Sequence, residues 1–433
     1  MRFKLGLFIL LWMAQSCLAA VTIENWQTAQ GSRVYFVPTP SLPMVDVRVA
    51  FDAGSARDGA QFGLAALTSA LLENGAGDWD ADEVARRFES VGATFSGGIS
   101  QDMAWLSLRS LVEPNLLNKA LATYQMVLTQ PRFAEDDFQR EKSRTLAGLK
   151  HREESPAAIA SMAFYHALYK DHPYAHPEDG VVQTVSGFES SDLKGFYKKY
   201  YVAANAVVVI VGDVSRQQAE QIASQLMSGL PVGEKPSEIP VVDVSSVPSV
   251  QRIDFPSTQT HILFGMPGVH RKDADYFPLY VGNHILGGGS LVSRLFDEVR
   301  EKRGLAYTAS SHFMPLFRSG PFIVSLQTRN DQADKALEVA ETALNSFVVQ
   351  GPSDAELQSA KQNIVGGFAM RVDTNSKLVD YVTMIGFYQQ PLDYLEQFQR
   401  KIQAVSVGDV KEAFKRRIHP EWMQTIMVGK RER

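Results

Sequence analysis

The sequence predicts an α+β protein built from two tandem homologous lobes, each a mainly antiparallel sheet packed with helices. Three observations carry this prediction. The chain repeats the order of its segments once, about 220 residues apart. Within each copy, runs of strands and runs of helices are separated rather than strictly alternating. A Pro-, Val- and Ser-rich stretch joins the copies. We therefore expect an N-terminal lobe at 21–230, a linker at 231–250 and a C-terminal lobe at 251–433.

The repeat is visible in three pairs of similar segments. In the last pair, each segment has a Val-Ser start, a helix with an aromatic residue, a basic pair, a polar loop and a strand that ends in glycine. Chance similarity between helices is the alternative, but it does not explain why three matches keep one order. The pairs are 62–75 with 277–289, 133–149 with 352–368, and 184–214 with 404–430.

Short apolar runs bounded by turn residues predict the strands of both lobes. The last strand of each copy is apolar almost throughout. The segment 62–75, which reads FGLAALTSALLENG, follows a loop and predicts an amphipathic helix. The predicted strands are 33–40, 44–54, 103–111 and 206–213 in the first copy, and 260–268, 305–313, 320–328 and 423–429 in the second.

Length and charge restrict the class of protein. A chain of 433 residues with 45% hydrophobic residues can form an ample core in two or three domains. The formal net charge is −5, and no block of Lys and Arg interrupts the sequence. A surface for duplex nucleic acid is therefore not expected, because such a surface needs a dense array of cations.

The first 20 residues predict a secretory signal peptide. Basic residues precede an apolar run from Leu5 to Met13, and small residues at Ala19 and Ala20 offer the cleavage site. The run is too short for a membrane anchor, and the context of Cys17 is poor for lipidation. Because Cys17 is the only cysteine, the mature chain would have no disulfide. We expect an exported, periplasmic protein without stable membrane insertion.

The segment 287–307 of the C-terminal lobe contains the first candidate site. Ser290 or Ser293 can cap a helix that ends before Gly304, a residue suited to the left-handed conformation after a helix. The helix would bury its apolar positions, which are Leu295, Phe296 and Val299.

Arg300 and Tyr307 stand at the two ends of the turn that follows this helix. Arg300 is in the last helical turn, and Tyr307 begins the next strand. Two such hydrogen-bond donors can hold a carbonyl or a developing oxyanion. The alternative is a basic helix end favoured by the helix dipole, together with a half-buried tyrosine. The residues alone leave both interpretations open.

The segment 287–307, which reads GGGSLVSRLFDEVREKRGLAY, closely resembles the C-lobe signature of the pitrilysin (insulinase-type, inverted zincin) metallopeptidase family. Shorter similarities are AFDAGSARDG followed by FGLA, then FQREK, HPYAHPEDG and VVVIVGDV. The resemblance covers roughly residues 25–430. It implies the two-lobe subunit form of that family, which is half of a clamshell.

The resemblance also implies that the zinc site of the family is missing here. The family motif H-x-x-E-H, two ligands and a base, aligns with Ala66, Ser69 and Ala70. The third ligand position falls on Gly148 or the preceding alanine, although Glu141 seven residues earlier is retained. A catalytic zinc needs three protein ligands and a water, so the site is expected to be absent.

Other residues offer a metal site only weakly. His166, His172 and His176 are loosely spaced, and two of them precede prolines, so we expect loop-packing histidines. Glu73 shares the stripe of Ala66 and Ala70, but a single carboxylate does not form a metal site. We expect the chain itself to hold no cofactor.

The resemblance implies a function in a complex. In two-chain members of the family, one chain carries zinc and the other contributes an Arg/Tyr pair. This chain resembles the second kind, so Arg300 and Tyr307 would complete the zinc site of a homologous peptidase subunit. A peptide substrate would add as a strand, with the Gly-rich segment 92–100 as the candidate edge. The alternative is a stand-alone peptide-binding or scaffold protein.

Overall fold

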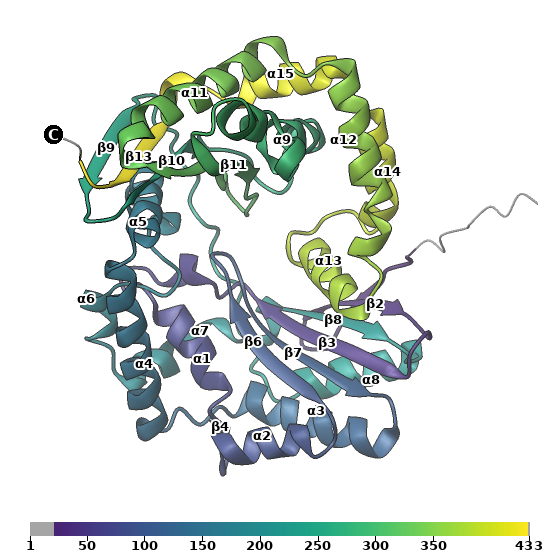
Figure 1. Ribbon diagram of the computed structural model, residues 1–433. Coiled ribbons are helices and arrows are strands. Elements are labelled where there is room, and N and C mark those ends of the chain that lie inside the picture. The colour runs from purple at the N-terminus through teal and green to yellow at the C-terminus, as the bar shows by residue number, and fades with distance from the viewer. Residues whose placement is uncertain (1–20, 432–433) are drawn as a thin grey trace, which may run out of the picture.

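The computed structural model describes residues 21–431, and it contains one large sheet from each half of the chain (Figure 1). The predicted signal peptide lies outside the described residues. The first sheet has the order β1-β2-β8-β3-β7-β6, and the second has the order β11-β12-β10-β13-β9. The strands are β1 (Glu24–Gln27), β2 (Arg33–Pro38), β3 (Met44–Phe51), β6 (Thr94–Ile99), β7 (Ala104–Leu111), β8 (Ala206–Gly212), β9 (Ser249–Asp254), β10 (Gln259–Pro267), β11 (Ala306–Phe313), β12 (Pro321–Arg329) and β13 (Gln424–Gly429), with a small hairpin of β4 (Gly75–Ala76) and β5 (Trp79–Asp80).

The two sheets have the same topology. In the first, β2 pairs in parallel with β8, and the other strand pairs are antiparallel. In the second, β9 pairs in parallel with β13, and the remaining pairs are antiparallel. The order β2-β8-β3-β7-β6 therefore corresponds to β9-β13-β10-β12-β11, and β1 is an addition in the first sheet. The predicted fold class, two homologous α+β lobes with mainly antiparallel sheets, is confirmed, and an observed strand overlaps every predicted one.

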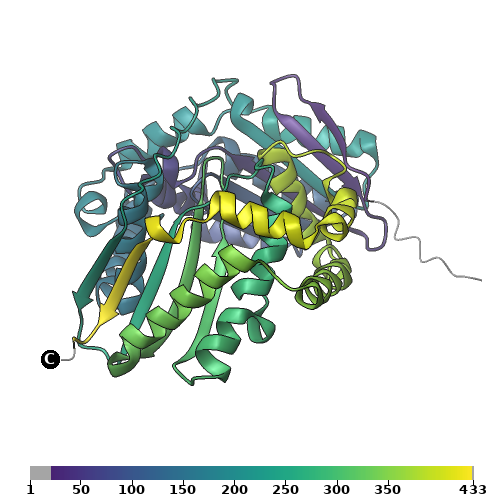
Figure 2. The same ribbon diagram turned by 90° about the horizontal axis from the view of Figure 1, so that it is seen from above.

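Helices from the same half cover one face of each sheet. In the first sheet, β7 contacts α3, β2 contacts α8 and β6 contacts α1. In the second, α11 and α15 lie over one face (Figure 2). The helices are α1 (Leu64–Leu72), α2 (Ala81–Glu89), α3 (Pro114–Thr129), α4 (Glu135–Glu153), α5 (Pro156–Tyr169), α6 (Val182–Val185), α7 (Ser190–Tyr200), α8 (Arg216–Met227), α9 (Tyr276–Asn283), α10 (Arg294–Phe296), α11 (Ala333–Gln350), α12 (Asp354–Gly366), α13 (Asn375–Phe387), α14 (Tyr394–Ala404) and α15 (Val407–Arg417).

The two halves exchange helices. Helix α5 of the first half packs on β10 and β13 of the second sheet, and α13 of the second half packs on β8 and β3 of the first (Figure 1). Glycines permit both close approaches. A Cβ on Gly386 of α13 would lie 2.6 Å from the Tyr35 ring, and one on Gly265 of β10 would lie 3.1 Å from Phe164 of α5. Each sheet is therefore completed by a helix from the other half.

Strand β8 is apolar throughout because both of its faces are covered, and all seven of its residues are buried. Val208 and Ile210 belong to the core of the N-terminal half. Val207, Val209 and Val211 belong to a second core that extends through the C-terminal half. A strand buried on both faces is expected to be a continuous apolar run.

The connection between the halves is packed rather than free. Its Pro231 and Val232 carbonyls accept hydrogen bonds from the N–H groups of Ala203 and Ala204, each 2.9 Å long. Ile239 and Val242 are buried. Within residues 21–431, no helix has the length and apolar character that a membrane crossing requires.

Candidate functional site

Helix α1, which carries the degenerate motif positions, is held at its start by Asp58. The Asp58 carboxylate accepts hydrogen bonds from the N–H groups of Gly63 and Ala65, both 2.7 Å long. These bonds satisfy donors that a helix N-terminus leaves unpaired. Burial raises the pKa of Asp58 to about 7, although both hydrogen bonds oppose that rise. The helix is thus a well-anchored scaffold element.

The motif positions offer little to a metal. Ala66 is half-buried, Ser69 is buried and Ala70 is exposed, all on α1. Helix α4 packs on α1 and carries Gly148, which is exposed, and a Cβ added there would meet no atom within 4 Å. Of these four residues, only Ser69 has a side-chain oxygen, and a neutral hydroxyl replaces neither an imidazole nor a carboxylate. Within the described residues, no three His, Cys, Asp or Glu side chains form a metal-binding group.

Glu73, at the end of α1, contacts the edge of the first sheet. Its Oε1 accepts a hydrogen bond of 2.5 Å from the N–H of Gly97 on β6. Burial raises the pKa of the Glu73 carboxyl, the bond from Gly97 opposes this, and the charge of Glu141 adds to the rise. The segment 92–100 does contain an edge strand, as its glycines indicated. Its contact with Glu73 was not predicted, because the two residues are 24 positions apart.

The three candidate histidines lie in separate surroundings. His166 is exposed on α5. The Nε2 of His172 lies 2.9 Å from the carbonyl oxygen of Pro240. His176 is buried and stacks on Phe62, with ring centroids 4.3 Å apart. The last two have the loop-packing contacts that the sequence indicated.

The segment before Arg300 is less regular than the expected helix. It forms a 3₁₀ turn at Ser290–Val292, the single turn of α10, and a π turn at Asp297–Glu301. Ser293 occupies the N-cap position, but its hydroxyl donates to the carbonyl of Ser290, 2.8 Å away, so it does not cap α10. A helical segment therefore runs over residues 294–301 and ends before Gly304, as expected, but its second part is a π turn and Ser293 gives it no side-chain cap. The three apolar positions are buried, and Gly304 has a φ of 61°, as predicted.

The structure brings Arg300 and Tyr307 together. The Arg300 guanidinium carbon lies 4.8 Å from the centroid of the Tyr307 ring and 4.8 Å from that of Phe296. Tyr307 is 76% exposed, so it is not a half-buried core residue. It lies on β11, an edge strand whose register with β12 shifts between Ala306 and Ala309. The pair presents a guanidinium and a phenol at the free edge of the second sheet.

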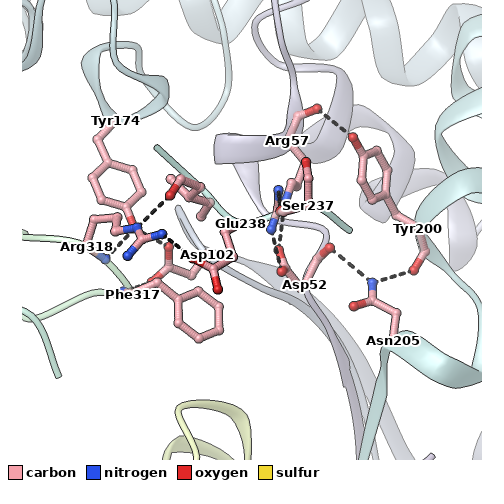
Figure 3. Close-up of polar contacts among 11 residues, drawn as sticks. Asp52, Arg57, Asp102, Tyr174, Tyr200, Asn205, Ser237, Glu238, Phe317 and Arg318 are labelled. Atoms are coloured by element: carbon pink, nitrogen blue, oxygen red, sulfur yellow. Dashed lines mark hydrogen bonds and ion pairs between the residues drawn. The ribbon is translucent and has the colours of Figure 1, made fainter. Parts of the chain in front are cut away.

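Asp102 joins the two halves, and sequence reasoning missed it. Its Oδ1 accepts a hydrogen bond of 2.6 Å from the Tyr174 hydroxyl. Its Oδ2 accepts from the N–H of Phe317 at 2.8 Å (Figure 3). The same oxygen accepts from the Tyr388 hydroxyl at 2.9 Å. Burial raises the pKa of this carboxyl, and the hydrogen bonds oppose the rise. Because its partners come from distant segments, no local motif signals its role.

Comparison with known proteins agrees with this architecture. The family described as insulinase (peptidase family M16) matches residues 33–178, and the M16 inactive domain matches residues 187–364. The crystal structure of a peptidase M16 inactive domain from Pseudomonas fluorescens superposes with a TM-score of 0.92. That protein is 37% identical, and the match covers 95% of this chain and 98% of the other. A protease from Helicobacter pylori superposes with a TM-score of 0.86 at 21% identity, covering 94% and 99%.

Two curated relatives extend the comparison. A protein of Helicobacter pylori named "Non-peptidase homolog YmxG" is 26% identical over 380 residues, which cover 86% of each chain. An "Uncharacterized zinc protease" of Rickettsia bellii is 26% identical over 351 residues, covering 80% of this chain and 84% of the other. The fold and the altered motif define a two-lobe peptidase homologue whose aligned zinc positions carry neither histidine nor carboxylate. The chain belongs to the M16 peptidase family, as an inactive homologue.

Proposed function

We propose that this chain is the non-catalytic, substrate-binding subunit of an exported heterodimeric zinc peptidase. Its partner would be a homologous M16 subunit with an intact H-x-x-E-H motif, which would hold the zinc. Arg300 and Tyr307 would project into the partner's site and bind the carbonyl of the scissile peptide bond. The predicted signal peptide supports export to the periplasm.

The observation that carries the proposal is the exposed pair itself. An arginine stacked on a tyrosine that is 76% exposed has no evident role in the core. Both residues carry N–H or O–H donors suited to an anionic oxygen. The chain retains this pair although its own α1 lacks ligands, which favours a role toward another chain.

A substrate peptide would add to the β6 edge as an extra strand. Gly97 and Gly98 lack side chains on this edge, so a second backbone can approach closely. The Gly97 N–H is already bonded to Glu73. A peptide that pairs at this position would displace the Glu73 carboxylate and offer a backbone carbonyl to the Gly97 N–H instead. The Glu73 carboxylate would lose this hydrogen bond, but its return to solvent would partly offset the loss.

Reconstitution tests the proposal. The mature chain, mixed with an M16 subunit of the same organism that has the intact motif, should raise peptide cleavage well above that of the partner alone. Arg300→Ala and Tyr307→Phe should leave assembly intact. Each should lower kcat/KM, by about 100-fold if it removes an oxyanion donor in a preorganised site. If the pair mainly positions substrate, the change should appear largely in KM.

Arg303→Ala is the matched control, because Arg303 is nearby but pairs with Glu298, its NH1 lying 2.6 Å from a carboxylate oxygen. It should retain the wild-type rate. The double variant of Arg300 and Tyr307 should lose less than the product of the single effects, because both donors serve one carbonyl. Wild-type kcat and KM in both single variants would mean that the pair is structural. The stand-alone peptide-binding protein would then be the better interpretation.

A further inference from the structure

A basic cavity lies where the first half, the linker and the second half meet. Its volume is about 740 Å³, which is within the range of small-molecule sites. Leu316, Phe317 and Phe387 supply apolar surface. Its cationic side chains are Arg33, Arg57, Lys235, Arg271, Lys272 and Arg318. Only two carboxylates line it, from Asp52 and Glu238, so positive charge is in excess by four in a chain whose net charge is −5.

Both carboxylates are already engaged (Figure 3). The Arg57 guanidinium holds Asp52 through two bonds of 2.6 and 2.5 Å, and its third nitrogen donates to the carbonyl of Ser237. Arg318 bonds to Glu238 at 2.8 Å and to the Ile239 carbonyl at 2.5 Å. These contacts fix the linker against both halves. They leave the other four cations of the cavity without a carboxylate partner among the described residues.

Arg271 is the most constrained of these four. Its guanidinium carbon lies 5.2 Å from the centroid of the Tyr388 ring. Its Nε is buried and has no hydrogen-bond partner among the described residues. Arg271 has no carboxylate partner among the described residues, and an anionic oxygen is the partner that best satisfies a guanidinium. Arg33 donates to the Gly386 carbonyl, while Lys235 and Lys272 are exposed.

We propose that this cavity binds a small soluble polyanion, a molecule that carries phosphate or carboxylate groups with two or more negative charges. The four cations without carboxylates supply the charge, and the guanidinium of Arg271, which lines the cavity, supplies planar N–H donors. Because all three parts of the chain line the cavity, the ligand would bridge them and stabilise their arrangement. This site is independent of the proposed peptidase role, since it involves neither Arg300 nor the β6 edge.

Titration calorimetry of the mature chain with pyrophosphate and with citrate, at low ionic strength, tests the proposal. We expect saturable binding of at least one probe, a higher thermal midpoint in its presence, and weaker binding at 0.15 M salt because salt screens the charges. Binding of pyrophosphate alone would assign the phosphate class, and binding of citrate alone the carboxylate class. The proposal would be overturned if neither probe binds at concentrations up to about 10 mM, which would detect even a millimolar Kd.

Paired charge reversals locate the site. The double variant Lys235→Glu, Lys272→Glu should weaken binding at least tenfold. It should still fold, because neither lysine side chain has a hydrogen-bond or ion-pair partner among the described residues. Lys194→Glu with Lys198→Glu on α7 changes the net charge equally at exposed positions and should bind as the wild type does. Arg271→Lys, which keeps the charge but removes the planar guanidinium, should also weaken binding. Equal losses in the two double variants would refute a site in this cavity.

Discussion

Replacing Asp102 by alanine is expected to destabilise the protein strongly. The side chain is fully buried and accepts three hydrogen bonds, from Tyr174, Phe317 and Tyr388. Each buried donor left without a partner costs about 1–3 kcal/mol. The tyrosine hydroxyls can rotate toward other acceptors, whereas the Phe317 N–H is fixed by the backbone. We therefore expect a loss of about 3–6 kcal/mol, a large part of the ~5–15 kcal/mol that stabilises a typical protein.

Asp102→Asn separates the hydrogen bonds from the packing. The amide oxygen can still accept from Tyr174, and the amide nitrogen can donate to the Tyr388 hydroxyl. That nitrogen cannot accept from the Phe317 N–H, so one donor remains unpaired, at about 1–3 kcal/mol. Asp243→Ala, at an exposed linker position, should change stability by less than about 0.5 kcal/mol.

Urea unfolding followed by circular dichroism and tryptophan fluorescence measures these differences. The expected order of stability is wild type and Asp243→Ala, then Asp102→Asn, then Asp102→Ala. An Asp102→Ala protein within 1 kcal/mol of the wild type, a margin below the ~1–3 kcal/mol cost of one orphaned donor, would refute the reasoning. An Asp102→Asn protein that is less stable than Asp102→Ala would also refute it, because hydrogen-bond acceptance by residue 102 would then not explain its contribution to stability.

Three further predictions follow from the packing and the buried carboxyls. Fragments 21–230 and 251–433 should each show no cooperative unfolding transition alone, because each lacks the helix, α13 or α5, that packs on its sheet from the other half. A mixture of the two should regain the transition. Cooperative unfolding of an isolated fragment would contradict this. Burial raises the pKa of Asp58 from 3.8 to about 7, so its contribution to stability is complete below pH 3.8 and is lost as the pH rises through 7. Between pH 4 and 8 this loss amounts to on the order of 4 kcal/mol of unfolding free energy, and Asp58→Asn should lack most of it. Urea titrations at several pH values measure the difference, and an unchanged pH dependence in the variant would count against it. Glu73→Gln keeps an acceptor for the Gly97 N–H but removes a buried charge, so at pH 8 its thermal midpoint should equal or exceed that of the wild type. Glu73→Ala removes the acceptor and should melt at a lower temperature. The reverse order would disprove the role of residue 73 as the acceptor for Gly97.

Local sequence patterns predicted the strands that have buried apolar runs, but they missed β1 and β9, whose residues are partly or mostly exposed. The apolar run of β8 indicates a strand covered on both faces, and the glycines of 92–100 indicate an edge. Such patterns say which side of an element is buried, but they do not say which element covers it. The exchange of α5 and α13 therefore could not be predicted from periodicity.

The candidate site was predictable only in part for the same reason. Arg300 and Tyr307 were found because they flank one short turn. Asp102 was not, because its partners lie 72, 215 and 286 positions away along the chain. The helix that contains Arg300 was located correctly, but its π turn and the bond of the Ser293 hydroxyl to Ser290 were not predicted.

The helix exchange also has a consequence for the order in which the protein folds during synthesis. The first sheet is complete along the chain once β8 has been made, but α13 emerges from the ribosome only much later. Until then, Val207, Val209 and Val211 have no cover from that helix, although all three are buried in the finished protein. An incomplete sheet of this kind exposes apolar surface and is prone to aggregation. A chain that folds from its N-terminus would therefore have to keep this face of its first half covered or unfolded until residues near 387 are available.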